Sequence, residues 1–220
     1  MIPIFADLEE AELNELGHGV RVRRVKKGAI IFVEGEPGDG VYFLHSGKVK
    51  IYKLMEDGRE KILHFVNPGD VFAEILLFDE GNFPASAAAL ENSEIAVINN
   101  AEMRRILAAN PQLAWRMLGI MSRRLRQAFI QVRDLAYRDV HSRLAAVLKD
   151  LAAEYGRSTD RGVRIELALS QQELANLVGA SRETVARALS QFKKSGCLDT
   201  DQRYICVTDM EALEEWAEMA

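Results

Sequence analysis

A segment near the C-terminus, Leu169–Gly196, reads LSQQELANLVGASRETVARALSQFKKSG and contains two helix starts separated by a glycine. Ser170 and Glu173 have the spacing of a capping box. In this arrangement the hydroxyl accepts a backbone N–H of the first turn, and the carboxylate accepts the N–H of the serine. A helix therefore begins just after Ser170, and Gly179 supplies the backbone freedom that ends it. Ser181 is then the N-cap of a second helix.

The two faces of this second helix differ in chemistry. One side carries Val185, Ala188, Leu189 and Phe192, and the other carries Arg182, Glu183, Ala186, Arg187 and Ser190. Two short helices joined by a glycine turn, the second polar near its start, are typical of a helix-turn-helix whose second helix enters the major groove of DNA. An ordinary helical hairpin with a solvated charged face is the alternative.

The polar face predicts how DNA is recognised. Arg182 and Arg187 can each offer two donors to O6 and N7 of guanine, and Glu183 can accept from the N4 amine of cytosine. These three residues are therefore predicted to read bases. The residues predicted to contact phosphates are Ser181, Thr184 and Gln172, and Lys193 and Lys194 add positive charge at the far end of the helix.

The net charge of the chain is unusual for a protein that binds DNA. The formal charge is -5, but the tail Asp209–Ala220 contains five acidic residues and neither Lys nor Arg. The rest of the chain is therefore close to neutral. Binding to double-stranded DNA would depend on a local basic patch and not on the overall charge.

Targeting signals and cysteine motifs are both missing from the sequence. No apolar run approaches membrane length, and the acids Asp7, Glu9 and Glu10 are incompatible with a signal peptide. We expect a cytoplasmic protein that does not bind a membrane. Cys197 and Cys206 are too far apart for a CxxC motif, and we expect buried small hydrophobic residues, with a redox or metal role as the alternative.

The first half of the chain predicts a short helix followed by strands. Asp7 and Glu10 predict a helix that continues through Leu13 and Leu16. Between residues 20 and 98, short apolar or alternating runs are separated by glycine-bearing turns: AIIFV, VYFLH, VKIYKL, KILHFV, DVFAEILLF, ASAAAL and EIAVI. Many short strands at regular intervals are typical of an antiparallel barrel or jelly roll.

Helical periodicity returns after Asn99. A short helix is predicted over 101–109, and Pro111 opens a long helix that reaches about Arg138. Apolar residues recur along it at alternating steps of three and four: Leu118, Met121, Leu125, Ala128, Val132 and Leu135. This seam favours pairing with a second copy of the chain in a homodimer, and packing on the barrel of the same chain is the alternative.

The remaining segments surround the helix-turn-helix. A hinge is expected near Asp139, followed by a helix over 141–155, a polar loop GRSTDRG and the strand VRIEL. Beyond the two helices, 197–200 and 203–207 flank a polar turn, which is typical of the hairpin of a winged helix. The tail helix places Met210, Leu213 and Trp216 at a buried-face spacing.

Together these motifs resemble the Crp/Fnr superfamily of bacterial transcription regulators over nearly the whole chain. The segments that carry the resemblance are GEPGDGVYFLHSGKVKIY, NPGDVFAEILLF, RRL in the long helix and ASRETVARAL. The last is similar to the catabolite activator branch, where the matching residues read a TGTGA-type half-site. The resemblance implies an α+β fold: an N-terminal antiparallel β jelly roll like a cyclic-nucleotide-binding domain (1–110), a dimerisation helix (111–138) and a C-terminal winged helix-turn-helix (139–220). It also implies RNA polymerase as a partner.

The expected effector pocket departs from the pattern that binds cyclic AMP. The resemblance places these residues there: Glu74, Ser86, His64, Ala128 and Phe129. Glu74 and Ser86 match the residues that hold the ribose hydroxyl and the cyclic phosphate, but Pro84 or Ala85 stands where an arginine belongs. The two positions on the long helix lack the hydroxyls that contact the base. A buried phosphodiester needs a compensating charge or many donors, so the sequence disfavours cyclic AMP and leaves the effector unknown.

Haem and an iron–sulfur cluster are two metal-containing groups that an effector domain of this kind can hold. His64 matches a strand position that lines the pocket, so haem is a candidate ligand, and a hydrogen-bonded barrel histidine is the alternative. The cysteine and histidine of the carbon monoxide sensor branch correspond to Ala73 and Ile75. The N-terminal cysteine cluster of the oxygen-sensing branch is missing, so we expect no iron–sulfur cluster.

The sequence thus predicts a homodimeric, sequence-specific transcription regulator that is not an enzyme. An effector in the barrel would control its binding to two-fold sites with TGTGA-like half-sites. One alternative is a ligand-binding regulatory module that acts through protein partners and not DNA. Another is a cupin-type metalloenzyme, which usually needs clustered ligands such as an HxH pair, whereas His45 and His64 are isolated.

Overall fold

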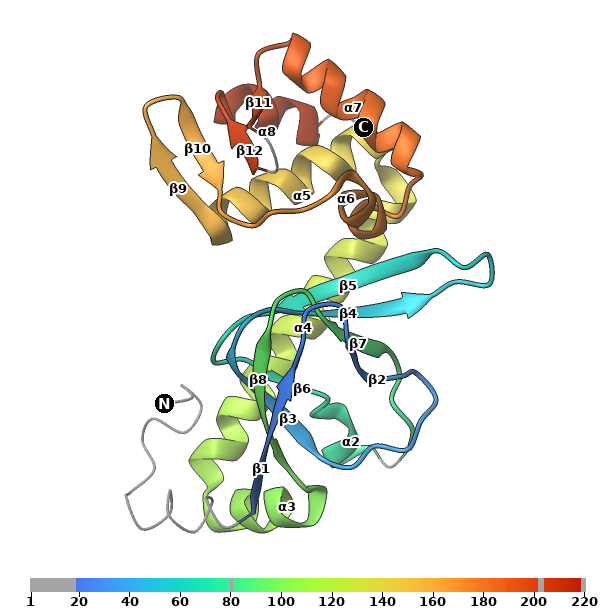
Figure 1. Cartoon of the computed structure of the whole chain (residues 1–220), viewed down its shortest axis with the longest axis vertical. Coiled ribbons are helices and arrows are strands. Elements are labelled where there is room, and N and C mark those ends of the chain that lie inside the picture. Colours follow the sequence, from blue (N-terminus) through green and yellow to red (C-terminus); the bar gives the residue numbers. More distant parts are fainter. Residues whose placement is uncertain (1–18, 80, 202–203, 219–220) are drawn as a thin grey trace. The chain divides into compact units, whose positions relative to one another are not determined.

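The computed structural model describes residues 19–79, 81–201 and 204–218 (Figure 1). Its contacts divide the chain into two compact units, 1–125 and 126–220, and the long helix α4 (Pro111–Tyr137) crosses the division. The short helix expected from Asp7 through Leu16 lies outside the described residues. The three-part division at residues 110 and 138 stays a prediction.

Two antiparallel four-stranded sheets form the first unit. Their strand orders are β1-β8-β3-β6 and β2-β7-β4-β5. The strands are β1 (Val20–Val25), β2 (Ile30–Phe32), β3 (Val41–Ser46), β4 (Val49–Leu54), β5 (Glu60–Val66), β6 (Val71–Phe72), β7 (Ser86–Ala89) and β8 (Ser93–Ile98). This arrangement confirms the predicted antiparallel jelly roll.

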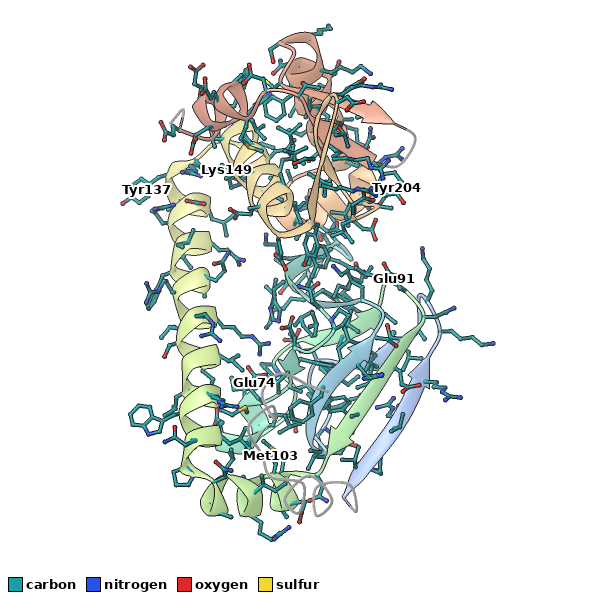
Figure 2. The ribbon with its side chains drawn as sticks, turned by 90° about the vertical axis from the view of Figure 1, so that its left-hand side faces the viewer. Glu74, Glu91, Met103, Tyr137, Lys149 and Tyr204 are labelled. Atoms are coloured by element: carbon teal, nitrogen blue, oxygen red, sulfur yellow. The ribbon has the colours of Figure 1, made fainter. Side chains whose placement is uncertain are left out.

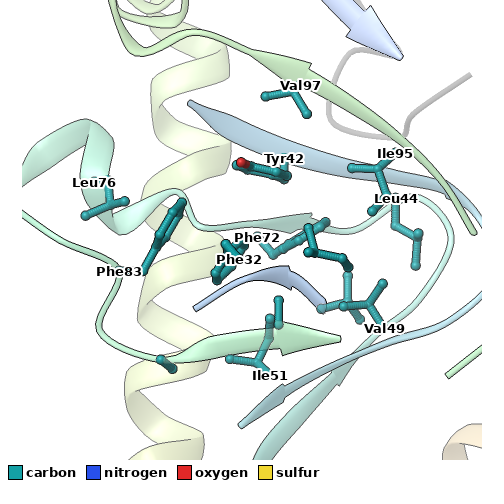
Figure 3. Close-up of a cluster of buried hydrophobic side chains, with 14 residues drawn as sticks. Phe32, Tyr42, Leu44, Val49, Ile51, Phe72, Leu76, Phe83, Ile95 and Val97 are labelled. Atoms are coloured by element: carbon teal, nitrogen blue, oxygen red, sulfur yellow. The ribbon is translucent and has the colours of Figure 1, made fainter. Parts of the chain in front are cut away.

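The alternation of side chains along β3 builds two apolar cores. Tyr42 and Leu44 belong to the cluster between the sheets, where the stacked rings of Phe32 and Phe83 lie 3.9 Å apart (Figure 3). Val41 and Phe43 point the other way, as successive strand residues must. They pack with residues of α3 (Asn100–Ala109) and α4: Met103, Ile106, Leu113 and Met117. The first turns of α4 are therefore part of the first unit.

One predicted strand, DVFAEILLF, is wrong in its second half. β6 ends at Phe72, and residues Ile75–Phe78 form the short helix α2. Ala73 between them has φ 60°, a left-handed conformation that interrupts an extended strand. Leu76 and Leu77 are adjacent on α2 but join different cores. Leu76 packs in the cluster between the sheets, and Leu77 packs in the cluster with α3 and α4. A continuous apolar run does not distinguish a strand from a buried helical turn.

The helix α4 presents two different apolar faces. Leu113 and Met117 are buried against the barrel, and Ile120 packs beside them. On another face, Leu118 and Leu125 of the predicted seam are 49% and 56% exposed, so this part of the seam does not pack on the barrel of its own chain. Met121, between these two leucines, is half-buried. Beyond Leu125, the seam residues Ala128, Val132 and Leu135 are exposed.

The second unit contains the winged helix-turn-helix. Its helices are the end of α4, α5 (Val140–Tyr155), α6 (Gln171–Val178), α7 (Arg182–Lys194) and α8 (Met210–Glu218). Its sheet has the order β11-β12-β10-β9, with β9 (Gly156–Thr159), β10 (Gly162–Ile165), β11 (Leu198–Asp201) and β12 (Tyr204–Val207). The predicted helices and the winged hairpin are confirmed. Helix α4 ends at Tyr137 and α5 begins at Val140, and the hinge expected near Asp139 stays a prediction.

The polar segment GRSTDRG was predicted as a loop, and this is wrong. Its first half is β9, which pairs with β10 from Gly156 opposite Ile165 to Thr159 opposite Gly162. β9 is an edge strand with every residue exposed. Its pairing with β10 is made by the backbone and its residues are exposed, so it needs no alternating apolar pattern.

Both cysteines are buried free thiols, as expected of small apolar residues. Cys197 is fully buried, and Cys206 is 8% exposed. Across the described ranges, no helix is long and apolar enough to cross a membrane.

Candidate nucleic-acid interface and effector site

The capping box at the start of α6 is present in full. The Oγ atom of Ser170 accepts the backbone N–H of Glu173 at 3.2 Å, and the Glu173 carboxylate accepts the N–H of Ser170 at 2.7 Å. At the other end, Gly179 adopts φ 73° and its N–H returns to the carbonyl of Ala175. These local contacts fix both ends of the first helix of the motif.

The N-terminus of α7 is held by a second cap. The Oγ atom of Ser181 accepts the backbone N–H of Thr184 at 3.2 Å, and their hydroxyls lie 3.0 Å apart. The apolar face of α7 is buried as predicted: Val185, Ala188, Leu189 and Phe192. Burial of this face sets which side of the helix faces solvent.

The three predicted base-reading residues lie together on that exposed side. Arg182, Glu183 and Arg187 are all exposed, within the first two turns of α7. The pKa of Glu183 lies below its usual value because its carboxylate accepts hydrogen bonds, first from its own backbone N–H and then from the Ser181 hydroxyl. The carboxylate is therefore an ionised acceptor. Arg187 donates to the Thr184 hydroxyl at 3.4 Å, which orients its guanidinium along the helix.

The predicted phosphate ligands lie at the starts of the two helices. Ser181 and Thr184 are at the N-terminus of α7, where free backbone N–H groups and the helix dipole favour an anion. Gln172 is exposed in the first turn of α6, and its amide donates to Asn176 at 2.9 Å. Lys193, at the far end of α7, is paired with Asp199 at 2.7 Å.

An ion pair with one buried partner, Glu74, lies in the expected effector region of the first unit. Glu74, labelled in Figure 2, is 6% exposed. Its carboxylate accepts from the guanidinium of Arg124 on α4, and the same guanidinium donates to the carbonyl of Val71. Arg124 was missed by the sequence reasoning. Its signal is its position: it follows Leu113, Met117 and Ile120 on the barrel-facing side of α4, where a cation has no reason to lie unless it has a partner.

His64 lies in the same electrostatic environment. Burial, and then the positive charge of Arg124, lower the pKa of His64 to about 4, so its ring is neutral at pH 7. Its Nε2 atom is buried and has no hydrogen-bond partner among the described residues. The two interpretations of His64, a haem ligand and a hydrogen-bonded barrel histidine, both stay predictions.

Ser86 is engaged with its neighbours. Its hydroxyl, in a residue that is 4% exposed, accepts the backbone N–H of Glu34 at 3.0 Å and also bonds Tyr52. Of the long-helix residues expected here, Ala128 is exposed and Phe129 is 66% exposed. Both belong to the second unit. Within the first unit, Arg124 contacts Glu74 and lies close enough to His64 to affect its charge. Within the described ranges, no three His, Cys, Asp or Glu side chains gather to hold a metal ion.

Comparison with known proteins decides the family. A cyclic nucleotide-binding domain matches residues 22–110, and a Crp-like helix-turn-helix domain matches residues 142–216. A CRP-like cAMP-activated global transcriptional regulator from Mycobacterium tuberculosis is 34% identical over 96% of this chain and 94% of its own length. The chain belongs to the Crp/Fnr family of transcription regulators.

Other Crp/Fnr relatives agree in sequence and in structure. The anaerobic regulatory protein of Bacillus subtilis is 31% identical over 91% of this chain and 85% of its own length. A structure of a CooA mutant from Carboxydothermus hydrogenoformans aligns with a TM-score of 0.84 and 25% identity, covering 99% of this chain and 95% of that one. Like these relatives the chain is a DNA-binding transcription regulator and not an enzyme, so the metalloenzyme alternative is set aside.

Proposed function

We propose that this Crp/Fnr protein is a homodimer that binds two-fold DNA sites with TGTGA-like half-sites, under the control of an effector in its barrel. The observation that carries the proposal is the exposed group Arg182, Glu183 and Arg187 at the capped start of α7. Arginine and glutamate there suit guanine and cytosine edges in the major groove. RNA polymerase is the partner that this family assignment suggests.

The exposed seam on α4 supports the homodimer. Leu118, Leu125, Val132 and Leu135 are each about half exposed or more, at the spacing of a coiled-coil seam. A second copy of the same helix is the surface that fits this spacing. Pairing around a two-fold axis would present two recognition helices to half-sites one DNA turn apart, about 34 Å.

The Glu74–Arg124 pair is our proposed centre of effector binding. A ligand that offers an anion to Arg124 or a donor to Glu74 would replace part of this ion pair. Because Arg124 belongs to α4, such a ligand would favour one arrangement of the helix over another and shift a pre-existing equilibrium between them. Its effect is limited by its difference in affinity for the two arrangements.

Cyclic AMP is kept as a second candidate effector, for one specific reason. Arg124 supplies a half-buried cation that the segment around Ser86 lacks, and the 34% identical relative is cAMP-activated. Against it stand the missing arginine at Pro84 or Ala85 and the missing hydroxyls at Ala128 and Phe129. We therefore propose an effector other than cyclic AMP bound in the usual mode.

Binding to duplex DNA tests the first proposal. The chain and its Arg182→Ala, Glu183→Ala and Arg187→Ala variants would be titrated onto a two-fold TGTGA duplex and onto a scrambled duplex. We expect each substitution to reduce the preference by about 1–3 kcal/mol, the worth of a good base contact. Lys194→Ala, at the far end of the helix, should weaken binding to both duplexes alike. A chain that prefers no sequence with any effector present would favour the alternative, a module that acts through protein partners.

A thermal-stability screen tests the effector site. A ligand that binds only the folded protein raises the melting temperature by mass action. Cyclic nucleotides, haem and small anionic metabolites would be compared on the chain and on the Arg124→Gln variant. We expect no shift with cyclic AMP, and a shift lost in the variant for the true effector. A cyclic AMP shift that Arg124→Gln abolishes would establish the second candidate.

A further inference from the structure

Arg143, in the first turn of α5, donates hydrogen bonds to the ends of two other helices. Its Nη1 atom lies 2.7 Å from the carbonyl oxygen of Arg138, the residue after α4, and its Nε atom lies 3.2 Å from the carbonyl oxygen of Val178, the last residue of α6. Carbonyls at helix C-termini have no partner in their own helix. They are also the negative ends of two helix dipoles, which a cation stabilises.

The link between α4 and α5 is ordered on its other side as well. Asp139 is the N-cap of α5, and its carboxylate accepts the backbone N–H of Ser142 at 2.8 Å and the Ser142 hydroxyl at 2.9 Å. Ser142 is 1% exposed. Hydrogen bonds from two side chains, those of Asp139 and Arg143, therefore brace the corner formed by residues 138–143.

This corner and the helix-turn-helix lie in one compact unit. Residues 126–220 include the last turns of α4, the corner and both helices of the motif. Val178 immediately precedes Gly179, the turn glycine, so Arg143 contacts the motif at the point that sets the direction of α7. Arg143 belongs to α5 and not to α7, which carries the side chains proposed to contact DNA.

We propose that Arg143 is a positioning residue that fixes the angle between the dimer helix α4 and the helix-turn-helix. This inference rests on the proposed homodimer. A small rotation at the corner moves each recognition helix, and the two motions change the separation of the two helices. A productive dimer needs that separation to match one DNA turn.

The shape of the guanidinium is central to this role. Its planar fork directs separate N–H groups at two acceptors, whereas a lysine ammonium is a compact point charge on a flexible stem. Arg143→Lys therefore keeps the charge and loses the geometry. Arg143→Ala loses both.

Binding to three duplexes distinguishes an effect on the position of the recognition helices from an effect on the stability of the protein. The first has a two-fold site, the second has its half-sites moved one base pair further apart, and the third has one half-site scrambled. Affinities would be measured for the full-length chain, Arg143→Ala, Arg143→Lys and a charge-matched control, Arg157→Ala, on the exposed edge strand β9. Melting temperatures would be recorded for all four proteins.

We expect Arg143→Ala to reduce the preference for the first duplex over the second by about tenfold, as the loss of one well-placed base contact would. The affinity of Arg143→Ala for the third duplex should be unchanged. The spacing preference of Arg143→Lys should lie between those of the unsubstituted chain and Arg143→Ala. The preference of Arg157→Ala should match that of the unsubstituted chain. An equal loss on all three duplexes, or an unchanged spacing preference, overturns the inference. If Arg143→Ala does not fold, Arg143→Lys decides by the same criteria. An unsubstituted chain that shows no preference for the two-fold site overturns the proposed dimer, and this inference with it.

Discussion

Glu74 and Arg124 are paired across 50 residues of sequence, and they join the short helix region after β6 to the long helix α4. Glu74 is buried, and the Arg124 side chain is 29% exposed. The same guanidinium reaches the carbonyl of Val71. A single cation therefore holds both the carboxylate and the backbone of the expected effector site against α4.

We expect Glu74→Ala and Arg124→Ala to be destabilising and strongly non-additive. Removing one partner leaves a buried charge uncompensated, at a cost of about 1–3 kcal/mol here because Arg124 is partly solvated. The double variant should lose less than the sum of the single variants, with a coupling of about 1 kcal/mol or more in urea denaturation. The exposed pair Arg24–Glu94 is the matched control, with a weaker expected coupling. Strict additivity at Glu74 and Arg124 would contradict the pairing.

His64 is expected to make stability depend on pH below neutrality. Its pKa is about 4 in the folded protein, below its ordinary value of 6.5, because burial disfavours the charged ring. Above pH 6.5 neither state holds the proton and stability is complete. As the pH falls below 6.5, the unfolded chain binds the proton first, and about 3 kcal/mol is lost by pH 4.

Denaturation curves at pH 7 and pH 5 would measure this loss. His64→Leu should reduce the difference between the two curves, while His45→Gln, at an exposed position, should leave it unchanged. An identical pH dependence in the His64 variant would show that other groups control it.

The capping box of α6 should contribute measurably to stability. Ser170→Ala removes the acceptor of the Glu173 N–H and is expected to cost about 1 kcal/mol. Gln171→Ala, at an exposed position one residue later, should be near neutral. Calorimetric melting of the three proteins gives the comparison, and equal melting temperatures would mean that water replaces the cap without loss.

The seam on α4 should control assembly. Val132→Asp introduces a charge into the proposed helix–helix interface and is expected to convert the dimer into a monomer in light scattering. Gln127→Glu also adds a negative charge to an exposed position of the same helix, but off the seam, and should leave the dimer intact. A monomeric unsubstituted chain, or a Val132→Asp variant that stays dimeric, would contradict the seam.

The capped helices were predictable because their signals are local. Ser170, Glu173 and Gly179 act within one or two turns, so their spacing alone determines where α6 begins and ends. The buried face of α7 follows from helical periodicity in the same way. The predicted base-reading residues then lie on the opposite face by geometry.

Other features depended on contacts between distant residues. The run after Phe72 became a helix because Ala73 is left-handed and because Leu76 and Leu77 fill two separate cores. β9 forms because its backbone pairs with the edge of β10, and no pattern of side chains in the sequence predicts such pairing.

The sequence by itself determined the helix-turn-helix, the outward position of Arg182, Glu183 and Arg187, and the exposed seam, since each follows from the period of a single helix. The tertiary structure alone decided that Arg124 meets Glu74 and that Arg143 joins the ends of α4 and α6. The physical reason is that a half-buried cation needs specific acceptors for its N–H groups. Those acceptors come from segments that only the packed fold brings within hydrogen-bonding distance.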